Sequence, residues 1–165
     1  MTAKALLQAA GDGTAVPAGY VGQVIASSTT SGSLAASGNY TSVSSIVLPT
    51  PGNYSIFSGF NVNRGVASFS ATQFVYGVSA VNDNGGTGFV YGVNAGYLLN
   101  VVPTSFTQVA LPIPPFMVKY DGTTITKFDD NVAFASGSTL YLKFYADTYS
   151  GTITWSGKLV AIRIA

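Results

Sequence analysis

Short runs of alternating apolar and polar residues, separated by turn residues, fill the sequence after Tyr20. In the clearest run, residues 139–146, the side chains of Leu140, Leu142 and Phe144 fall on one face of an extended chain. Further strand candidates are the ranges 20–25, 40–48, 53–63, 68–81, 89–99, 106–120 and 153–164. About eight strands with turns between them predict an all-β protein, and a jelly-roll-like β-sandwich is the simplest such architecture.

Two of these ranges carry residues that disturb a regular strand. Pro112, Pro114 and Pro115 lack the N–H that a central strand needs, so they predict an edge, a bulge or a bend within 106–120. Gly157 leaves two alternatives for the last range, either a pair of strands or one long strand bulged at the glycine. The ranges 27–39, 82–88 and 121–131 are rich in turn residues and are expected to be loops.

The first nineteen residues differ from the rest of the chain. Residues 2–10 favour one or two helical turns, and residues 11–19 continue as extended chain after a Gly-Asp-Gly break. We therefore expect an N-terminal arm at 1–19 and one β-sandwich domain at 20–165. The arm has too few consecutive apolar residues for a signal peptide, and no run of about 18 apolar residues predicts a transmembrane helix.

The chain has no histidine, no cysteine and no glutamate. Their absence rules out a Ser-His-Asp triad, Cys-His catalysis and ordinary zinc sites. The six acidic residues are all aspartates, and most stand beside Gly, Asn or another Asp, which is typical of turns. We expect no enzyme activity, no cofactor and no metal. A polysaccharide-cleaving enzyme would need two aspartates about 5–10 Å apart.

Charged residues are scarce, at 8% of the chain, and the formal net charge is +1. The Lys and Arg residues are scattered from Lys4 to Arg163 without a basic stripe, so nucleic acid is not an expected partner. A surface so poor in charge is either made polar by Ser, Thr and Asn or covered in large part by other chains. We expect both, and therefore a homo-oligomer or a larger assembly.

The aromatic residues offer a further candidate surface. Phe-Val-Tyr-Gly-Val occurs at 74–78 and again at 89–93, which predicts two neighbouring antiparallel strands with similar surroundings. Tyr76 and Tyr91 from this pair, together with the single tryptophan Trp155, are candidate residues of an oligomer or ligand surface. For Trp155 we favour a place in the core or in a subunit interface, and the alternative is an exposed platform on which a sugar stacks.

Four segments stand out in order along the chain: GDGTAVPAGYVG at 11–22, TSVSSIVL at 41–48 with the Pro-Gly turn after it, VALPIP at 109–114, and STLYL at 138–142 with the ending at 157–165. In this order they resemble a family of bacteriophage tail-fibre and head-decoration proteins. The chain departs from the family at Tyr54, where a tryptophan is usual, and in the repeated Phe-Val-Tyr-Gly-Val motif.

The resemblance implies a virion structural protein, often trimeric, with a jelly-roll-like domain. Because the chain has no shaft segment, a head decoration (cement) protein or short head fibre on the virion surface, assembled in the host cytoplasm, is the favoured expectation. Its partners would be sister copies and the major capsid protein. The apolar arm residues Leu6, Leu7, Val16, Pro17 and Tyr20 are the predicted docking contact. The alternative is a tail-fibre or receptor-binding module that contacts a host glycan or protein; neither function requires a membrane.

Overall fold

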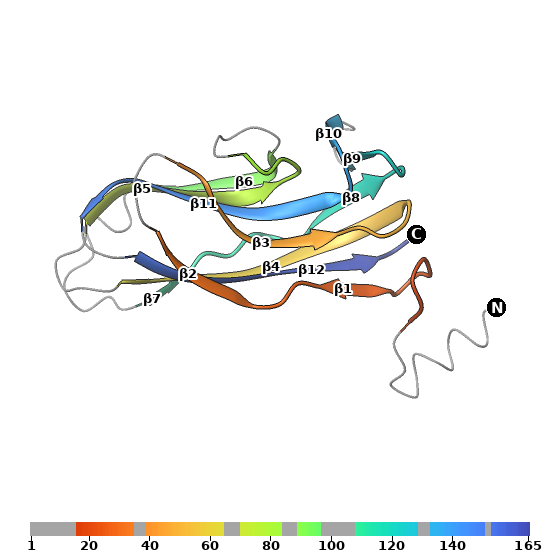
Figure 1. Cartoon of the computed structure of the whole chain (residues 1–165), viewed down its shortest axis with the longest axis horizontal. Coiled ribbons are helices and arrows are strands. Elements are labelled where there is room, and N and C mark those ends of the chain that lie inside the picture. The colour runs from red at the N-terminus through yellow and green to blue at the C-terminus, as the bar shows by residue number, and fades with distance from the viewer. Residues whose placement is uncertain are drawn as a thin grey trace.

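In the computed structural model of the chain, two β-sheets face each other across a hydrophobic core (Figure 1). The structure describes residues 16–34, 39–64, 70–83, 89–96, 108–128, 133–150 and 153–165. The regular structure in these ranges is all β-strand. The strands are β1 (Val24–Ala26), β2 (Thr30–Leu34), β3 (Thr41–Val47), β4 (Gly52–Arg64), β5 (Ser70–Ser79), β6 (Phe89–Gly96), β7 (Gln108–Ala110), β8 (Phe116–Tyr120), β9 (Thr124–Lys127), β10 (Ala133–Ser136), β11 (Thr139–Ser150) and β12 (Ile153–Arg163).

The strand order identifies the sandwich as a jelly roll. The larger sheet runs β1-β12-β4-β8-β9-β10, with β2 also paired to β12 and β7 also paired to β4. The smaller sheet runs β3-β11-β5-β6, and the pairings in both sheets are antiparallel. β1 and β2 both pair with β12, and β7 and β8 both pair with β4, so each of these two pairs can be counted as one interrupted strand. Each sheet then has the four strands of a jelly roll, and β9 and β10 are added at the edge of the larger sheet. The predicted jelly-roll-like β-sandwich is confirmed.

The larger sheet is curved as well as wide. In Figure 1, β8, β9 and β10 rise from the level of β4 and β12 toward that of β5 and β6. The sheet therefore wraps around one end of the core.

Alternation along the strands determines which side chains enter the core. In β8, Phe116, Val118 and Tyr120 are buried while Met117 and Lys119 are exposed. In β11, the prediction that Leu140, Leu142 and Phe144 share one face is confirmed, and this face enters the core, because all three residues are fully buried. These two strands thus each contribute one apolar face to the space between the sheets.

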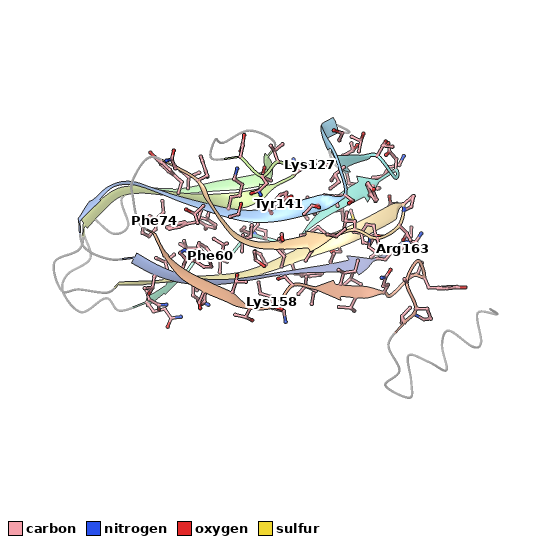
Figure 2. All side chains as sticks on the ribbon, viewed as in Figure 1. Phe60, Phe74, Lys127, Tyr141, Lys158 and Arg163 are labelled. Carbon is pink, nitrogen blue, oxygen red and sulfur yellow. The ribbon has the colours of Figure 1, made fainter. Side chains whose placement is uncertain are left out.

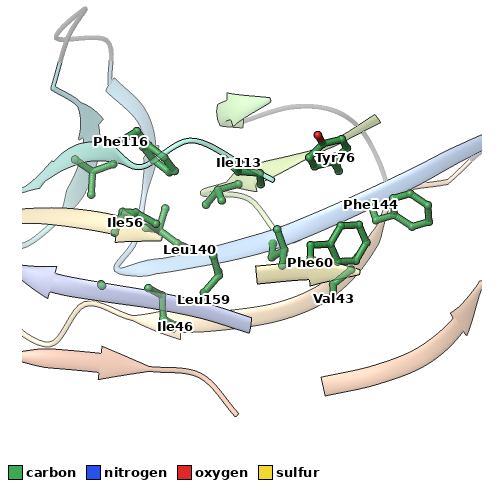
Figure 3. Packing of buried hydrophobic residues seen from close by; sticks show 14 of the residues in the cluster. Val43, Ile46, Ile56, Phe60, Tyr76, Ile113, Phe116, Leu140, Phe144 and Leu159 are labelled. Atoms are coloured by element: carbon green, nitrogen blue, oxygen red, sulfur yellow. The ribbon is translucent and has the colours of Figure 1, made fainter. Parts of the chain in front are cut away.

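Aromatic rings fill the centre of that space. The ring centroids of Phe60 and Phe144 lie 5.2 Å apart, and those of Phe74 and Phe144 lie 5.0 Å apart in an edge-to-face arrangement. Figure 2 shows Phe60 and Phe74 between the two sheets, and Figure 3 shows Phe60 beside Phe144 with Val43 below them. These residues come from both sheets, so the rings join the two layers.

Glycine at position 157 allows the sheets to approach closely at this point. A Cβ atom built on Gly157 of β12 would overlap Cγ1 of Val43 in β3 and would lie 3.0 Å from Cδ2 of Leu142 in β11. The register between β12 and β4 runs without a shift through this glycine. Of the two alternatives for 153–164, the structure therefore has one long strand, and the bulge at Gly157 is not present.

Other departures from the expected strands occur in polar segments. Five residues of the range 27–39, which was expected to be a loop, form β2, and Thr124–Lys127 within the expected loop 121–131 forms β9. The proline-bearing range 106–120 is divided into β7 and β8 by 111–115, as the prolines predicted. The predicted helix at 2–10 lies outside the described residues.

Candidate functional site

The predicted docking arm lies largely outside the described residues, which begin at Val16. Leu6 and Leu7 are therefore not placed. Val16 and Tyr20 are half-buried and Pro17 is exposed, in a turn that precedes β1. The backbone N–H of Tyr20 donates to the carbonyl of Pro17 at 3.3 Å, which closes this turn.

The segment that follows this turn is attached to the end of β12. The N–H of Gly22 donates to the carbonyl of Arg163 at 2.8 Å, and the N–H of Arg163 donates to the carbonyl of Gln23 at 2.9 Å. The side-chain oxygen of Gln23 accepts a 2.8 Å hydrogen bond from the N–H of Gly19. The described end of the arm, residues 16–19, therefore lies beside the C-terminal end of β12.

Two of the three aromatic residues proposed for an outer surface lie in the core. Tyr76 is 4% exposed and its hydroxyl donates to the carbonyl of Pro112 at 3.3 Å, so the prediction of a surface role for Tyr76 is wrong. Trp155 is 8% exposed, which contradicts its place on a surface and confirms the favoured place in the core. Tyr91 lies in β6 with its backbone paired to Val78, and its side chain is outside the described ones. The repeated motif does form two neighbouring antiparallel strands, β5 and β6, as predicted.

The indole of Trp155 is held against a glycine. Trp155 of β12 pairs in register with Gly32 of β2. A Cβ atom at position 32 would lie 2.7 Å from Cζ2 of Trp155, so only glycine at this position leaves room for the indole ring. The indole Nε1–H is buried and has no hydrogen-bond partner among the described residues. Trp155 thus stabilises the sandwich by packing rather than by a polar contact.

The aspartates whose side chains are described, Asp83 and Asp121, each have structural partners. Asp121 Oδ1, in the turn after β8, accepts hydrogen bonds from the N–H groups of Thr123 and Thr124, both at 2.8 Å. These bonds, that of Thr123 first, lower the pKa of Asp121 below its usual value. Asp83 forms an ion pair with Lys143. No group of three or more metal-binding side chains occurs among the described residues.

The ion pair lies on the outer side of the smaller sheet, yet Lys143 is fully buried. Its Nζ lies 2.6 Å from Oδ1 of Asp83 and donates to the carbonyl of Val81 at 3.4 Å. The ring of Tyr40 covers it, with Nζ 5.4 Å from the ring centroid, and burial raises the pKa of Tyr40. Lys143 pairs in register with Gly77, which leaves room beside its aliphatic stem. The segment 81–83 and Tyr40 therefore cover this part of the smaller sheet.

The outer side of the larger sheet has a different character, because apolar side chains gather there. The register places side chains in two adjacent rows that cross the strands. The first row contains Val24, Ile162, Ser55 and Met117. It continues to Phe128, whose N–H donates to the carbonyl of Met117. The second row contains Ala26, Val160 and Phe57 and continues to Pro115. We call these two rows the outer apolar face.

Most of this face is open in the single chain. Val24 is 61% exposed, Phe128 48%, Phe57 37% and Met117 36%. With strands about 4.8 Å apart and rows about 7 Å apart, the five strands β1, β12, β4, β8 and β9 give the face an area on the order of 300 Å². That is the size of the largest apolar patch on a typical monomer, which is often functional.

Positive charge borders the outer apolar face on two opposite sides. Lys119 pairs in register with Asn53, two residues beyond the first row, and Lys158 pairs with Gly59, two residues beyond the second. Both lysines are exposed, and Figure 2 shows Lys158 on the side of the larger sheet that is away from the smaller one. Among the described residues, the carboxylate at this border is Asp121, which lies close enough to Lys119 to interact with its charge and accepts hydrogen bonds within its own turn.

Sequence reasoning did not identify this face, although a signal for it exists. Residues 159–162, Leu-Val-Ala-Ile, are apolar at every position rather than at alternate ones. In a sandwich strand, Leu159 and Ala161 enter the core, so Val160 and Ile162 must lie on the outer side. A strand that is apolar on both faces predicts a second covered surface.

Comparisons with known proteins do not add to this description. No protein-family model matches the chain, and no curated protein matches it either. Among the described residues, no helix is long and apolar enough to cross a membrane.

Proposed function

We propose that this chain is a bacteriophage virion structural protein, a head decoration protein that binds and stabilises the capsid. The observation that carries the proposal is the outer apolar face, which lies on a jelly-roll sandwich that has very few charges. An apolar area that stays exposed in the single chain favours binding to a larger particle. The ordered sequence segments that resemble virion surface proteins support the same class of function.

The proposal includes self-association, with a trimer as the favoured state. Several identical copies held together contact a capsid lattice at several points at once, so modest contacts add up to stable attachment. The arm that begins beside β12 supplies a second contact, for which Val16, Pro17 and Tyr20 are the described candidates. The protein then resides on the virion surface after assembly in the host cytoplasm.

The test is binding to phage heads that lack this protein, followed by sedimentation of the heads. The full chain is expected to co-sediment and to saturate, and a chain without residues 2–18 is expected to remain folded by circular dichroism but to bind much more weakly. If the full chain leaves the heads bare, the decoration function is wrong. If the shortened chain still saturates them, the arm is not a contact.

Immuno-labelling of intact virions separates this function from the tail-fibre alternative. Label on the heads supports a decoration protein. Label confined to the tail would replace it with a receptor-binding module, whose host ligand would then be sought among surface glycans and proteins.

A further inference from the structure

The outer apolar face is bordered by cations on both sides, and this charge pattern restricts what can cover it. Lys119 and Lys158 lie in rows separated by the six residue steps from Asn53 to Gly59 along β4, which is about 20 Å at 3.3 Å per step. The apolar rows lie between them. An occupant must therefore match an apolar centre and two separate positive charges.

The area of the face indicates the centre of an interface rather than a complete one. A stable protein–protein interface covers about 800 Å² on each partner, whereas the apolar rows provide on the order of 300 Å². Polar residues surround the rows, including Asn53, Asn61, Thr126 and the two lysines. This is the usual plan of an apolar centre with a polar rim.

Charge argues against a second copy of this chain as the occupant. The carboxylate described at the border of the face, Asp121, uses one oxygen for three hydrogen bonds to Thr123 and Thr124. Counting only the described side chains, two such faces packed together would bring four lysines to one interface against two Asp121 carboxylates, which leaves an excess of positive charge. A partner with carboxylates at the matching positions removes this repulsion.

We infer that the outer apolar face is the docking face for another protein, one whose surface presents an apolar centre flanked by carboxylates about 20 Å apart. This inference rests on the proposed function and specifies which face of the sandwich meets the virion. Burial of the apolar rows supplies most of the binding free energy of the contact. Lys119 and Lys158 orient the docked sandwich and increase its association rate.

The test uses a matched pair of valines. Val24 is 61% exposed on the outer apolar face, and Val47 of β3 is 56% exposed on the outer side of the smaller sheet. In Val24→Asp a charge enters the contact, so binding to phage heads that lack this protein is expected to weaken at least tenfold. Val47→Asp makes the same change on the opposite side and is expected to weaken binding less than twofold. Circular dichroism and thermal melting establish that both variants fold like the natural chain.

The charge pattern is tested separately with Lys119→Glu and Lys158→Glu. Each is expected to weaken head binding at low salt and to reduce its dependence on salt between about 50 and 500 mM, because exposed charges interact less as salt increases. Unchanged binding and unchanged salt dependence in both variants would exclude an acidic rim on the partner.

Two further probes separate other occupants. Vesicles of three parts phosphatidylcholine to one part phosphatidylglycerol test a membrane, and sedimentation velocity of the chain alone tests self-association. Vesicle binding that Val24→Asp abolishes, or an oligomer that it converts to monomer, would overturn the inference. If the natural chain and both valine variants bind heads equally, the docking face is wrong while the proposed function stands. If the natural chain binds no heads, both fail.

Discussion

The closest approach of the two sheets, at Gly157, gives the sharpest test of the packing. Replacing Gly157 with alanine inserts a methyl group that overlaps Cγ1 of Val43 and lies 3.0 Å from Leu142 and 3.3 Å from Phe60. Val43 is β-branched and lies next to its own backbone, so it cannot move aside as a long flexible side chain would. The sheets must therefore separate locally or the side chains must leave their preferred rotamers.

The expected magnitude comes from two opposing terms. Overpacking of a well-filled core costs about 1–3 kcal/mol. The change from glycine to alanine recovers about 0.4–1 kcal/mol by restricting the unfolded chain. We expect Gly157→Ala to lower the free energy of unfolding by about 1–2 kcal/mol, equivalent to a fall in Tm of roughly 2–8 °C for a chain of this size.

The matched control is Gly59→Ala in the neighbouring strand. A Cβ atom at Gly59 would have no heavy atom within 4 Å, so only the unfolded-chain term operates and stability is expected to rise by about 0.4–1 kcal/mol. Urea unfolding followed by the fluorescence of Trp155 measures both variants at one protein concentration. The double variant Val43→Ala/Gly157→Ala is expected to lose less stability than the sum of its single changes. If Gly157→Ala matches Gly59→Ala, or if the two changes add without coupling, the close approach of the sheets is not as described.

Three further predictions concern the polar groups. Asp83→Ala leaves Lys143 buried without its carboxylate and is expected to lower the free energy of unfolding by roughly 1–3 kcal/mol, a range that already allows for the partial exposure of Asp83. Lys143→Met removes the buried charge itself and is expected to leave the free energy of unfolding nearly unchanged. Equal losses for the two variants in urea unfolding would contradict this. Tyr54→Phe removes a buried hydroxyl that donates to a backbone carbonyl at 2.6 Å and is expected to cost about 1 kcal/mol by the same assay, so an unchanged midpoint would show that the bond contributes nothing. The pKa of Asp121 is lowered in the fold, so the stabilisation by its carboxylate is complete at pH values above the usual pKa of about 3.9 and is lost as the pH falls through the lowered pKa. Carboxyl NMR titration is expected to find this low pKa in the natural chain and a higher pKa in Thr123→Val. A normal pKa for Asp121 in the natural chain would refute the assignment.

The strands that alternate cleanly could be predicted from the sequence, and those that depend on a partner could not. The run from Leu140 to Phe144 and the paired Phe-Val-Tyr-Gly-Val strands follow from period-2 patterning and an Asn-Gly turn signal. In contrast, β2 has the sequence Thr-Ser-Gly-Ser-Leu, which has no strand signal of its own. It forms because β12 offers an edge to pair with and because Gly32 accommodates Trp155.

The candidate site was harder to predict because a face of a strand is defined only by its neighbours. Tyr76 has the polar hydroxyl of a surface residue, but the nearby carbonyl of Pro112 satisfies it and lets the ring enter the core. Lys143 occupies an outward position of β11, and its burial is explained by segment 81–83 and the ring of Tyr40, which cover it. The outer apolar face combines residues from β1, β12, β4 and β8 with Phe128 after β9, so the one local signal, the apolar run 159–162, marks only part of it.

The position of β12 in the larger sheet has a consequence for biosynthesis. This strand follows all the others in the chain, yet it separates β4 from β1 and β2 and pairs with all three. While a ribosome is still adding residues 153–163, the earlier strands of that sheet lack their central neighbour, and one edge of β4 has no ladder to join. The nascent polypeptide must therefore keep a long β-edge unpaired until translation of this last strand is complete, which is the interval in which it is most exposed to aggregation and to chaperone binding.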